Sequence, residues 1–137
     1  MFNYLMLAPL ILSRLREHLP QVAVSSSWGL SAIKEAPDQL PSIVVFLEDD
    51  QPVQQTGQGT VQKITQTWMV LVAVRDAEEE AGELISRIYR TLAGWRPNQI
   101  FEPLCRVRSS YKQDVSPNGV SYFPLSFETS FIFNTQE

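Results

Sequence analysis

Apolar residues near the start of the chain recur every three or four positions, which is the spacing of an amphipathic helix. The pattern predicts a helix over about Ala8–His18, with Pro9 in the first turn, where its missing N–H is tolerated. The apolar stripe of this helix comprises Ile11, Leu12, Leu15 and Leu19. We expect a short strand over Gln21–Ser25 to follow, and then a helical turn within Trp28–Ala36.

The next apolar stretches predict two strands that differ in their burial. Ser42–Leu47 is a continuous, partly β-branched apolar run, which is typical of a strand buried on both faces. Glu48–Gly59 is polar and is predicted to be an exposed loop or hairpin tip. Thr60–Val74 alternates polar and apolar residues at first and becomes fully apolar from Trp68 onwards. We therefore expect a strand that projects from the domain at one end and enters the core at the other.

A second amphipathic helix is predicted between Asp76 and Gly94. Asp76 is a candidate N-cap, and Glu79 stands three residues later, as in a capping box. Gly94 and then Pro97 are typical of a helix C-terminus. The apolar stripe of this helix comprises Ala77, Ala81, Leu84, Ile85, Ile88 and Leu92.

The last third of the chain predicts two further strands, Leu104–Lys112 and Val120–Phe133, with a turn at Ser116–Gly119. The order of elements is then helix, three strands, helix, two strands. This order favours an α/β (α+β) sandwich, in which helices flank a mostly antiparallel sheet and a β-hairpin or loop projects from it. We expect residues 1–137 to form a single domain.

The composition argues against several function classes. The chain has 137 residues, 44% of them hydrophobic and 19% charged, as in a folded globular protein. One Cys and one His exclude an internal disulfide, a Cys-based zinc site and a multi-histidine metal cage. The net charge of −4 argues against a general nucleic-acid binder. No apolar run reaches the ~18 residues of a membrane span, and the apolar N-terminus lacks the marks of a signal peptide. We expect a cytosolic chain with a reduced Cys105 and no cofactor.

Three groups of residues could in principle carry chemistry. Cys105 and His18 could form a nucleophile–base pair, but a small buried thiol and a surface imidazole are the simpler interpretation. The acidic run of Glu48, Asp49 and Asp50 could bind a hard cation, but three adjacent acids in a polar loop are usually solvated. Aromatic residues could line a ligand cleft or a base-stacking platform, although core packing is the simpler role for Trp68, Trp95, Phe123, Phe127, Phe131 and Phe133.

Charge is distributed unevenly along the chain. Residues 1–34 carry about +2, residues 35–83 about −8, residues 84–112 about +5, and the remainder about −3. A domain with one acidic and one basic flank can pair head to tail with copies of itself, and such contacts can close into a ring. Ordinary surface charge within one fold would give the same counts.

Several segments, taken in order along the chain, form a recognisable series. They are Arg14-Leu15 with Leu19-Pro20-Gln21-Val22, Pro41–Phe46, Gln62–Arg75, Gly94-Trp95-Arg96-Pro97 with Pro103-Leu104, and Tyr122 with Phe127-Glu128-Thr129. Together these segments resemble the tail terminator family of Mu-like phages, and the Gly-Trp-X-Pro sequence at the predicted helix end is the most specific of them. The chain departs from the family pattern in its apolar extension before Pro9 and in the short stretch Val74-Arg75-Asp76.

The resemblance implies a structural role in a virion. Tail terminators form a ring, typically of six copies, on the head-proximal end of the tail tube, where they stop polymerisation of the tube and, in contractile tails, engage the sheath. They then present the surface to which the filled head attaches. The partners implied are other copies of the chain, the tail tube protein, a sheath protein in contractile tails, and a head–tail connector protein, while DNA passes through the lumen without specific binding.

Charge and polarity nominate candidate interface residues for such contacts. Two alternatives stay open: another head–tail joining or tail completion protein of related fold, or a small enzymatic or ligand-binding domain that uses an aromatic cleft. The candidate interface residues are Glu48, Asp49, Asp50, Gln54, Gln55, Gln58, Gln62, Glu78, Glu79, Arg87, Arg90, Arg96, Arg106 and Arg108.

Overall fold

The fold combines two helices with one mixed sheet of six strands. A computed structural model describes residues 3–28, 39–56, 59–75, 77–115 and 119–136, but not the side chains of residues 54–56 and 77–79. The predicted helical turn within Trp28–Ala36 and the predicted N-cap Asp76 therefore lie outside the described residues, apart from Trp28. In chain order the elements are α1 (Leu7–His18), β1 (Ala23–Ser26), β2 (Ser42–Thr56), β3 (Val61–Arg75), α2 (Ala77–Leu92), β4 (Cys105–Val107), β5 (Asp114–Val115) and β6 (Val120–Asn134).

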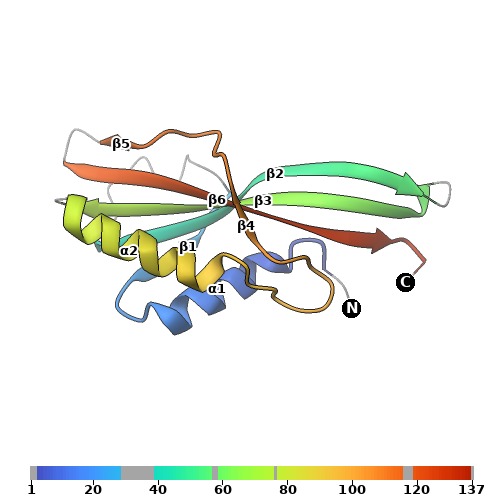
Figure 1. The fold of residues 1–137 in the computed structure, drawn as a ribbon, viewed down its shortest axis with the longest axis horizontal. Coiled ribbons are helices and arrows are strands. Elements are labelled where there is room, and N and C mark those ends of the chain that lie inside the picture. The colour runs from blue at the N-terminus through green and yellow to red at the C-terminus, as the bar shows by residue number, and fades with distance from the viewer. Residues whose placement is uncertain (1–2, 29–38, 57–58, 76, 116–118, 137) are drawn as a thin grey trace.

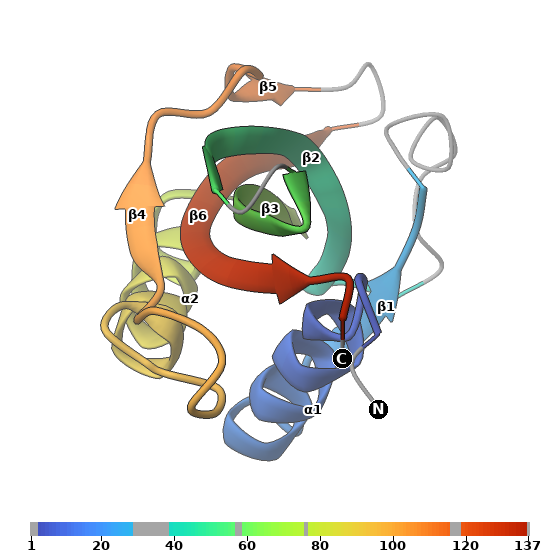
Figure 2. The same ribbon diagram turned by 90° about the vertical axis from the view of Figure 1, so that its right-hand side faces the viewer.

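Three strands of 15 residues each form the centre of the sheet. The strand order is β1-β2-β3-β6-β4, and β5 pairs with β6 beside β4. Strand β1 runs parallel to β2, and every other pairing is antiparallel. Figure 1 shows β2, β3 and β6 extending well beyond the helices at one end, and Figure 2 shows how strongly these strands twist about the long axis. The predicted α+β class, the mostly antiparallel sheet and the projection are confirmed.

The strand β3 has the predicted change of environment along its length. Its first three residues are half-buried, its side chains then alternate between half-buried and buried from Lys63 to Thr67, and the seven residues from Trp68 to Val74 are all buried. The first half lies in the projecting part, where β6 pairs with it as far as Val61↔Asn134. The projection therefore consists of three strands rather than one hairpin.

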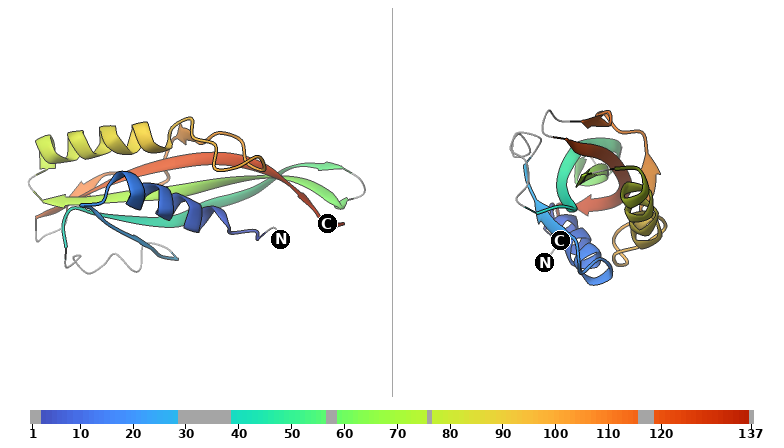
Figure 3. Two further views of the ribbon diagram at one scale, coloured as in Figure 1. Left: turned by 90° about the horizontal axis from the view of Figure 1, so that it is seen from below. Right: turned by 90° about the vertical axis from the view of Figure 1, so that its left-hand side faces the viewer.

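Apolar side chains cover both faces of the central sheet. On one face, α1 and α2 pack against the strands through residues such as Leu15, Ile88 and Val70, each of them fully buried. Figure 1 shows the two helices below the long strands, and Figure 3 shows them running alongside these strands. On the other face, a smaller cluster contains Phe46, Met69 and Leu71. Because Ile43 and Val45 belong to the first cluster and Phe46 to the second, β2 begins as the predicted strand with both faces covered.

Two predicted boundaries are wrong. Glu48–Gly59 is not mainly a loop, because β2 continues to Thr56 and pairs with β3 through bulges near Leu47/Asp49 and Pro52/Gln54. Bulges accommodate a Pro and polar residues within a ladder, which the polarity of the segment concealed. Strand β4 ends at Val107 rather than Lys112. Pro124 lies on β6 between the residues that pair with β4 and those that pair with β5, and it has no N–H to donate to a partner strand.

The end of α2 is held against the start of β4 by backbone hydrogen bonds. Gly94 adopts φ +79°, a conformation that favours glycine, and turns the chain out of the helix. Its N–H donates to the Leu104 carbonyl at 2.7 Å, and the Leu104 N–H donates to the Trp95 carbonyl at 2.8 Å. Trp95 is half-buried against the core, and the Arg14 guanidinium lies 5.1 Å from its ring centroid. The predicted role of Trp95 in packing the helix end is confirmed, with α1 as an additional partner.

Candidate interaction surfaces

A basic pocket lies where the chain passes from β4 to β5. It has a volume of about 520 Å³, and Phe123 and Pro124 of β6 contribute apolar lining to it. Three cations line it: Arg106 from β4, and Arg108 and Lys112 from the segment between the two strands. Tyr111 holds this segment against the sheet, because its ring packs edge-on against Phe46 with 6.1 Å between the ring centroids. We call this site the basic pocket.

The three cations of the basic pocket have no carboxylate partner among the described residues. Lys63–Glu102, at 3.6 Å, is the one ion pair found in that part of the chain. The Arg106 guanidinium stacks over Tyr89 at 5.4 Å from the ring centroid and donates to its hydroxyl at 2.8 Å. Its Nε is buried and has no hydrogen-bond partner. The pocket thus concentrates positive charge that the fold itself does not neutralise.

An acidic groove of about 220 Å³ lies between α2 and the segment that joins α1 to β1. Glu80 and Glu83 of α2 line this groove and are exposed. Arg87 also lines it, but its Nη2 donates to the His18 carbonyl at the end of α1, at 3.3 Å. The groove therefore keeps two exposed carboxylates that have no ion-pair partner in the described part of the chain.

A polar network joins the N-terminal segment to the base of the projecting strands. The Tyr4 hydroxyl donates to both Asp50 carboxylate oxygens at 2.9 Å. Gln66 is fully buried, donates to Asp50 at 3.1 Å and accepts from the Trp68 indole at 3.2 Å. Burial, with a contribution from Asp50, raises the pKa of Tyr4 to about 12. The Tyr4 ring also packs against the ring of Phe131, with 5.5 Å between the ring centroids. The N-terminal segment therefore packs against the base of the projecting strands and stabilises it.

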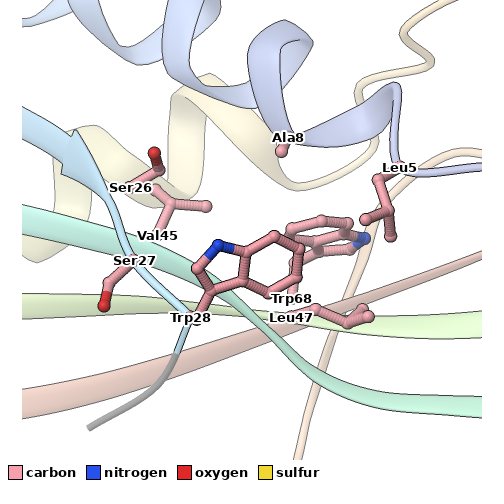
Figure 4. A pocket seen from close by; sticks show the side chains of 8 residues that line it. All are labelled: Leu5, Ala8, Ser26, Ser27, Trp28, Val45, Leu47 and Trp68. Carbon is pink, nitrogen blue, oxygen red and sulfur yellow. The ribbon is translucent and has the colours of Figure 1, made fainter. Parts of the chain in front are cut away.

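A small apolar pocket of about 240 Å³ lies near the end of β1 (Figure 4). Figure 4 shows the indole of Trp28 beside that of Trp68, with Leu5 and Leu47 nearby. Trp28 is 86% exposed, whereas Trp68 is 3% exposed. An exposed tryptophan over an apolar pocket is a common feature of protein interfaces.

A further pocket, of about 710 Å³, lies between α2 and β5 and is larger than the basic pocket. Its lining is mainly apolar and includes Val74, Ile85 and the exposed Val115. Burial raises the pKa of Tyr122, which also lines this pocket.

The aromatic residues considered for a ligand cleft do not line one common cleft. Trp68, Phe127 and Phe131 are in the core, and Phe123 and Phe133 are half-buried beside it.

Many of the candidate interface residues already have partners within the chain. Glu48 accepts from the Ser126 hydroxyl and from the Ser110 N–H, and Arg96 donates to the Phe101 and Gln99 carbonyls. Gln62, Asp50, Arg87 and Arg106 also make hydrogen bonds within the fold, and Asp49 accepts from Gln51. Arg90 and Arg108 are exposed and have no described carboxylate within 4.0 Å. The side chains of Gln54, Gln55, Glu78 and Glu79, and the whole of Gln58, lie outside the described residues.

The residues considered for chemistry are not assembled into a reactive site. His18 Nδ1 lies 3.0 Å from the Arg14 carbonyl at the end of α1, while Cys105 is on the edge strand β4. The expectation of a buried thiol is wrong, because Cys105 is exposed there. The three adjacent acids have separate partners, and no group of three potential metal ligands occurs among the residues that the structure describes.

Comparison with known proteins decides the family. The model of the family described as phage tail terminator protein matches residues 1–137. The chain belongs to the phage tail terminator protein family. The fold is similar to that of a chain in a solved structure titled "Virion of native gene transfer agent (GTA) particle", with a TM-score of 0.62 and 14% identity over 95% of this chain and 99% of that one. A search of curated protein sequences found no match.

Membership of the tail terminator family points to a phage structural tail protein and a virion component. The Gly94–Leu104 hydrogen bond and the packing of Trp95 give a physical reason for the Gly-Trp-X-Pro sequence that carried the resemblance. In this chain the Gly-Trp-X-Pro sequence closes α2 onto the edge of the sheet. Within the described residues, no helix is long and apolar enough to cross a membrane.

Proposed function

We propose that this protein caps the head-proximal end of a phage tail tube as a ring of six copies. In this role it stops polymerisation of the tube, and of a sheath where one is present, and offers the surface to which the filled head attaches. The observation that carries the proposal is the family match over the whole chain. The role is structural rather than catalytic. The partners are other copies of the chain, the tube protein and a connector protein of the neck.

Two features of the fold support the proposed ring. The projecting parts of β2, β3 and β6 provide an arm that can reach a neighbouring copy or the last layer of the tube. The unneutralised charges of the basic pocket and the acidic groove provide surfaces for contacts between copies. A net charge of −4 also suits a ring that DNA crosses without binding, because acidic surfaces repel phosphates.

Deletion of the gene from the phage or particle that encodes the protein tests the proposal. Without the terminator, tubes should continue to grow, and electron micrographs should show headless tails of long and variable length. Supplying the intact chain should restore tails of uniform length that carry heads. Tails of normal length with heads attached, in the absence of the protein, would contradict the proposed function.

A further inference from the structure

We propose that the basic pocket of one copy receives the carboxylates at the start of α2 from the next copy. The inference rests on the proposed ring and specifies which surfaces form its contacts. The basic side comprises Arg108 and Lys112, with Arg106 at the base of the pocket. The acidic side comprises Glu80 and Glu83.

The basic side has the properties of a site for carboxylates. Arg108 and Lys112 are exposed and have no carboxylate within 4.0 Å among the described residues, so their charges are available to a partner. Phe123 and Pro124 line the pocket, and an apolar lining excludes water and strengthens an ion pair formed above it.

The acidic side places several carboxylates close together on one helix. Glu80 and Glu83 are exposed side chains three positions apart on one helix, so they lie on neighbouring turns of the same surface. The sequence places two more acids, Glu78 and Glu79, in the first turn of α2, which gives four carboxylates within six residues. A rigid helix presents such charges at lower entropic cost than a loop.

The two surfaces are placed so that they do not neutralise each other within one copy. In the basic pocket, Arg106 contacts α2 through Tyr89, whereas Glu80 and Glu83 line the groove on the side of α2 that faces the segment between α1 and β1. Tyr111, which lines the basic pocket, packs on Phe46 at the face of the sheet away from the main core. Figure 1 shows the segment that leads to β5 and the helix α2 on opposite sides of the long strands. No ion pair joins the two surfaces in the described part of the chain. Contact between two different surfaces of identical copies is the arrangement that closes into a ring.

A second copy fits the basic pocket better than nucleic acid does. The pocket offers three cations with Asp114 exposed two residues after Lys112, rather than the extended basic stripe that a phosphate backbone follows. A second copy matches the pocket in stoichiometry, since every copy supplies one basic and one acidic surface. Each copy in a ring can thus satisfy both surfaces once.

Charge exchange between the two surfaces tests the pairing. The purified full-length chain is compared with Arg108→Glu/Lys112→Glu, with Glu80→Lys/Glu83→Lys, and with the chain that carries all four substitutions. Sedimentation velocity at about 50 mM and about 500 mM salt gives the oligomer fraction of each. Each two-site variant should weaken association at least tenfold, and the four-site variant should recover to within about threefold of the original chain.

Matched controls separate this pairing from general charge effects and from misfolding. Glu17→Lys, at an exposed position of α1 outside both surfaces, changes the net charge by the same amount as Glu80→Lys alone. Glu17→Lys should leave association unchanged, whereas Glu80→Lys alone should weaken it. Circular dichroism should show that all variants are folded. The inference is overturned if the four-site variant remains as weak as the two-site variants, if Glu17→Lys weakens association as much as Glu80→Lys, if the original chain stays monomeric, or if the basic pocket binds DNA instead. Those results would leave the tail-length test of the proposed function unaffected.

Discussion

Replacement of Glu48 by Ala should destabilise the fold, although sequence alone nominates this residue as part of an exposed acidic loop. The Glu48 carboxylate accepts from the Ser126 hydroxyl on β6 and, at 2.9 Å, from the Ser110 N–H in the segment before β5. It therefore ties β2 to two elements that are not its neighbours in the sheet. Ser126 is fully buried, so its hydroxyl would lose its partner without access to water.

The expected size of the effect follows from these two hydrogen bonds. A hydrogen bond to a charged group contributes about 1.5–3 kcal/mol, and Glu48 is half-buried, which favours the lower half of that range. With two such bonds, Glu48→Ala should lower the free energy of unfolding by about 3–4.5 kcal/mol. For a chain of this size, about 1 kcal/mol corresponds to a shift in Tm of roughly 3–4 °C, so the midpoint should fall by roughly 9–18 °C.

Urea denaturation followed by tryptophan fluorescence measures this loss, and Asp49→Ala is the matched control. Asp49 is exposed and accepts only from the exposed Gln51 in the described part of the chain, so its replacement should change stability by less than ~0.5 kcal/mol. Hydrogen exchange at the Ser110 amide should also accelerate in Glu48→Ala. Equal stabilities of the two variants would refute the structural role assigned to Glu48.

Three further predictions concern other parts of the fold. Trp95→Ala should cost about 2–3 kcal/mol, less than a fully buried Trp, because the ring is half-buried beneath Arg14; chemical denaturation measures the loss, and one below ~1 kcal/mol would contradict this packing. Because the pKa of Tyr4 is raised to about 12, its contribution to the free energy of unfolding should be complete below about pH 10 and lost as the pH rises through 12. Unfolding curves of Tyr4→Phe measured over this pH range should lack this loss of stability. Cys105 should react with a thiol reagent in the folded protein at a rate near that of the unfolded chain, and strong protection would contradict its exposed position on β4.

Local patterns in the sequence predict the helices and the long strands well. The stripe of Ile11 and Leu15 predicts α1 because helical periodicity directly reports one buried face. The change at Trp68 from alternating to continuous apolar residues predicts where β3 enters the core. Strand β2 is missed beyond Leu47 because an edge strand in a projection needs no apolar face, and its ladder depends on pairing with β3.

The candidate surfaces are less predictable, because counting charges along the sequence does not show which charged side chains bind other groups of the same chain. The basic block of the sequence includes Arg87, Arg96 and Arg108 alike. In the structure, Arg87 and Arg96 donate to backbone carbonyls, whereas Arg108 lines a pocket without an acidic partner among the described residues. Such separation depends on the long-range placement of the segment between β4 and β5, which no local pattern encodes.

The position of the protein in its assembled particle tests the central proposal most directly. Cryo-electron microscopy of intact virions should resolve a ring of six copies between the last layer of the tail tube and the neck, with the projecting strands of each copy directed at a neighbour or at the tube. A reconstruction of the tail–neck junction that contains no copy of this chain would contradict the account.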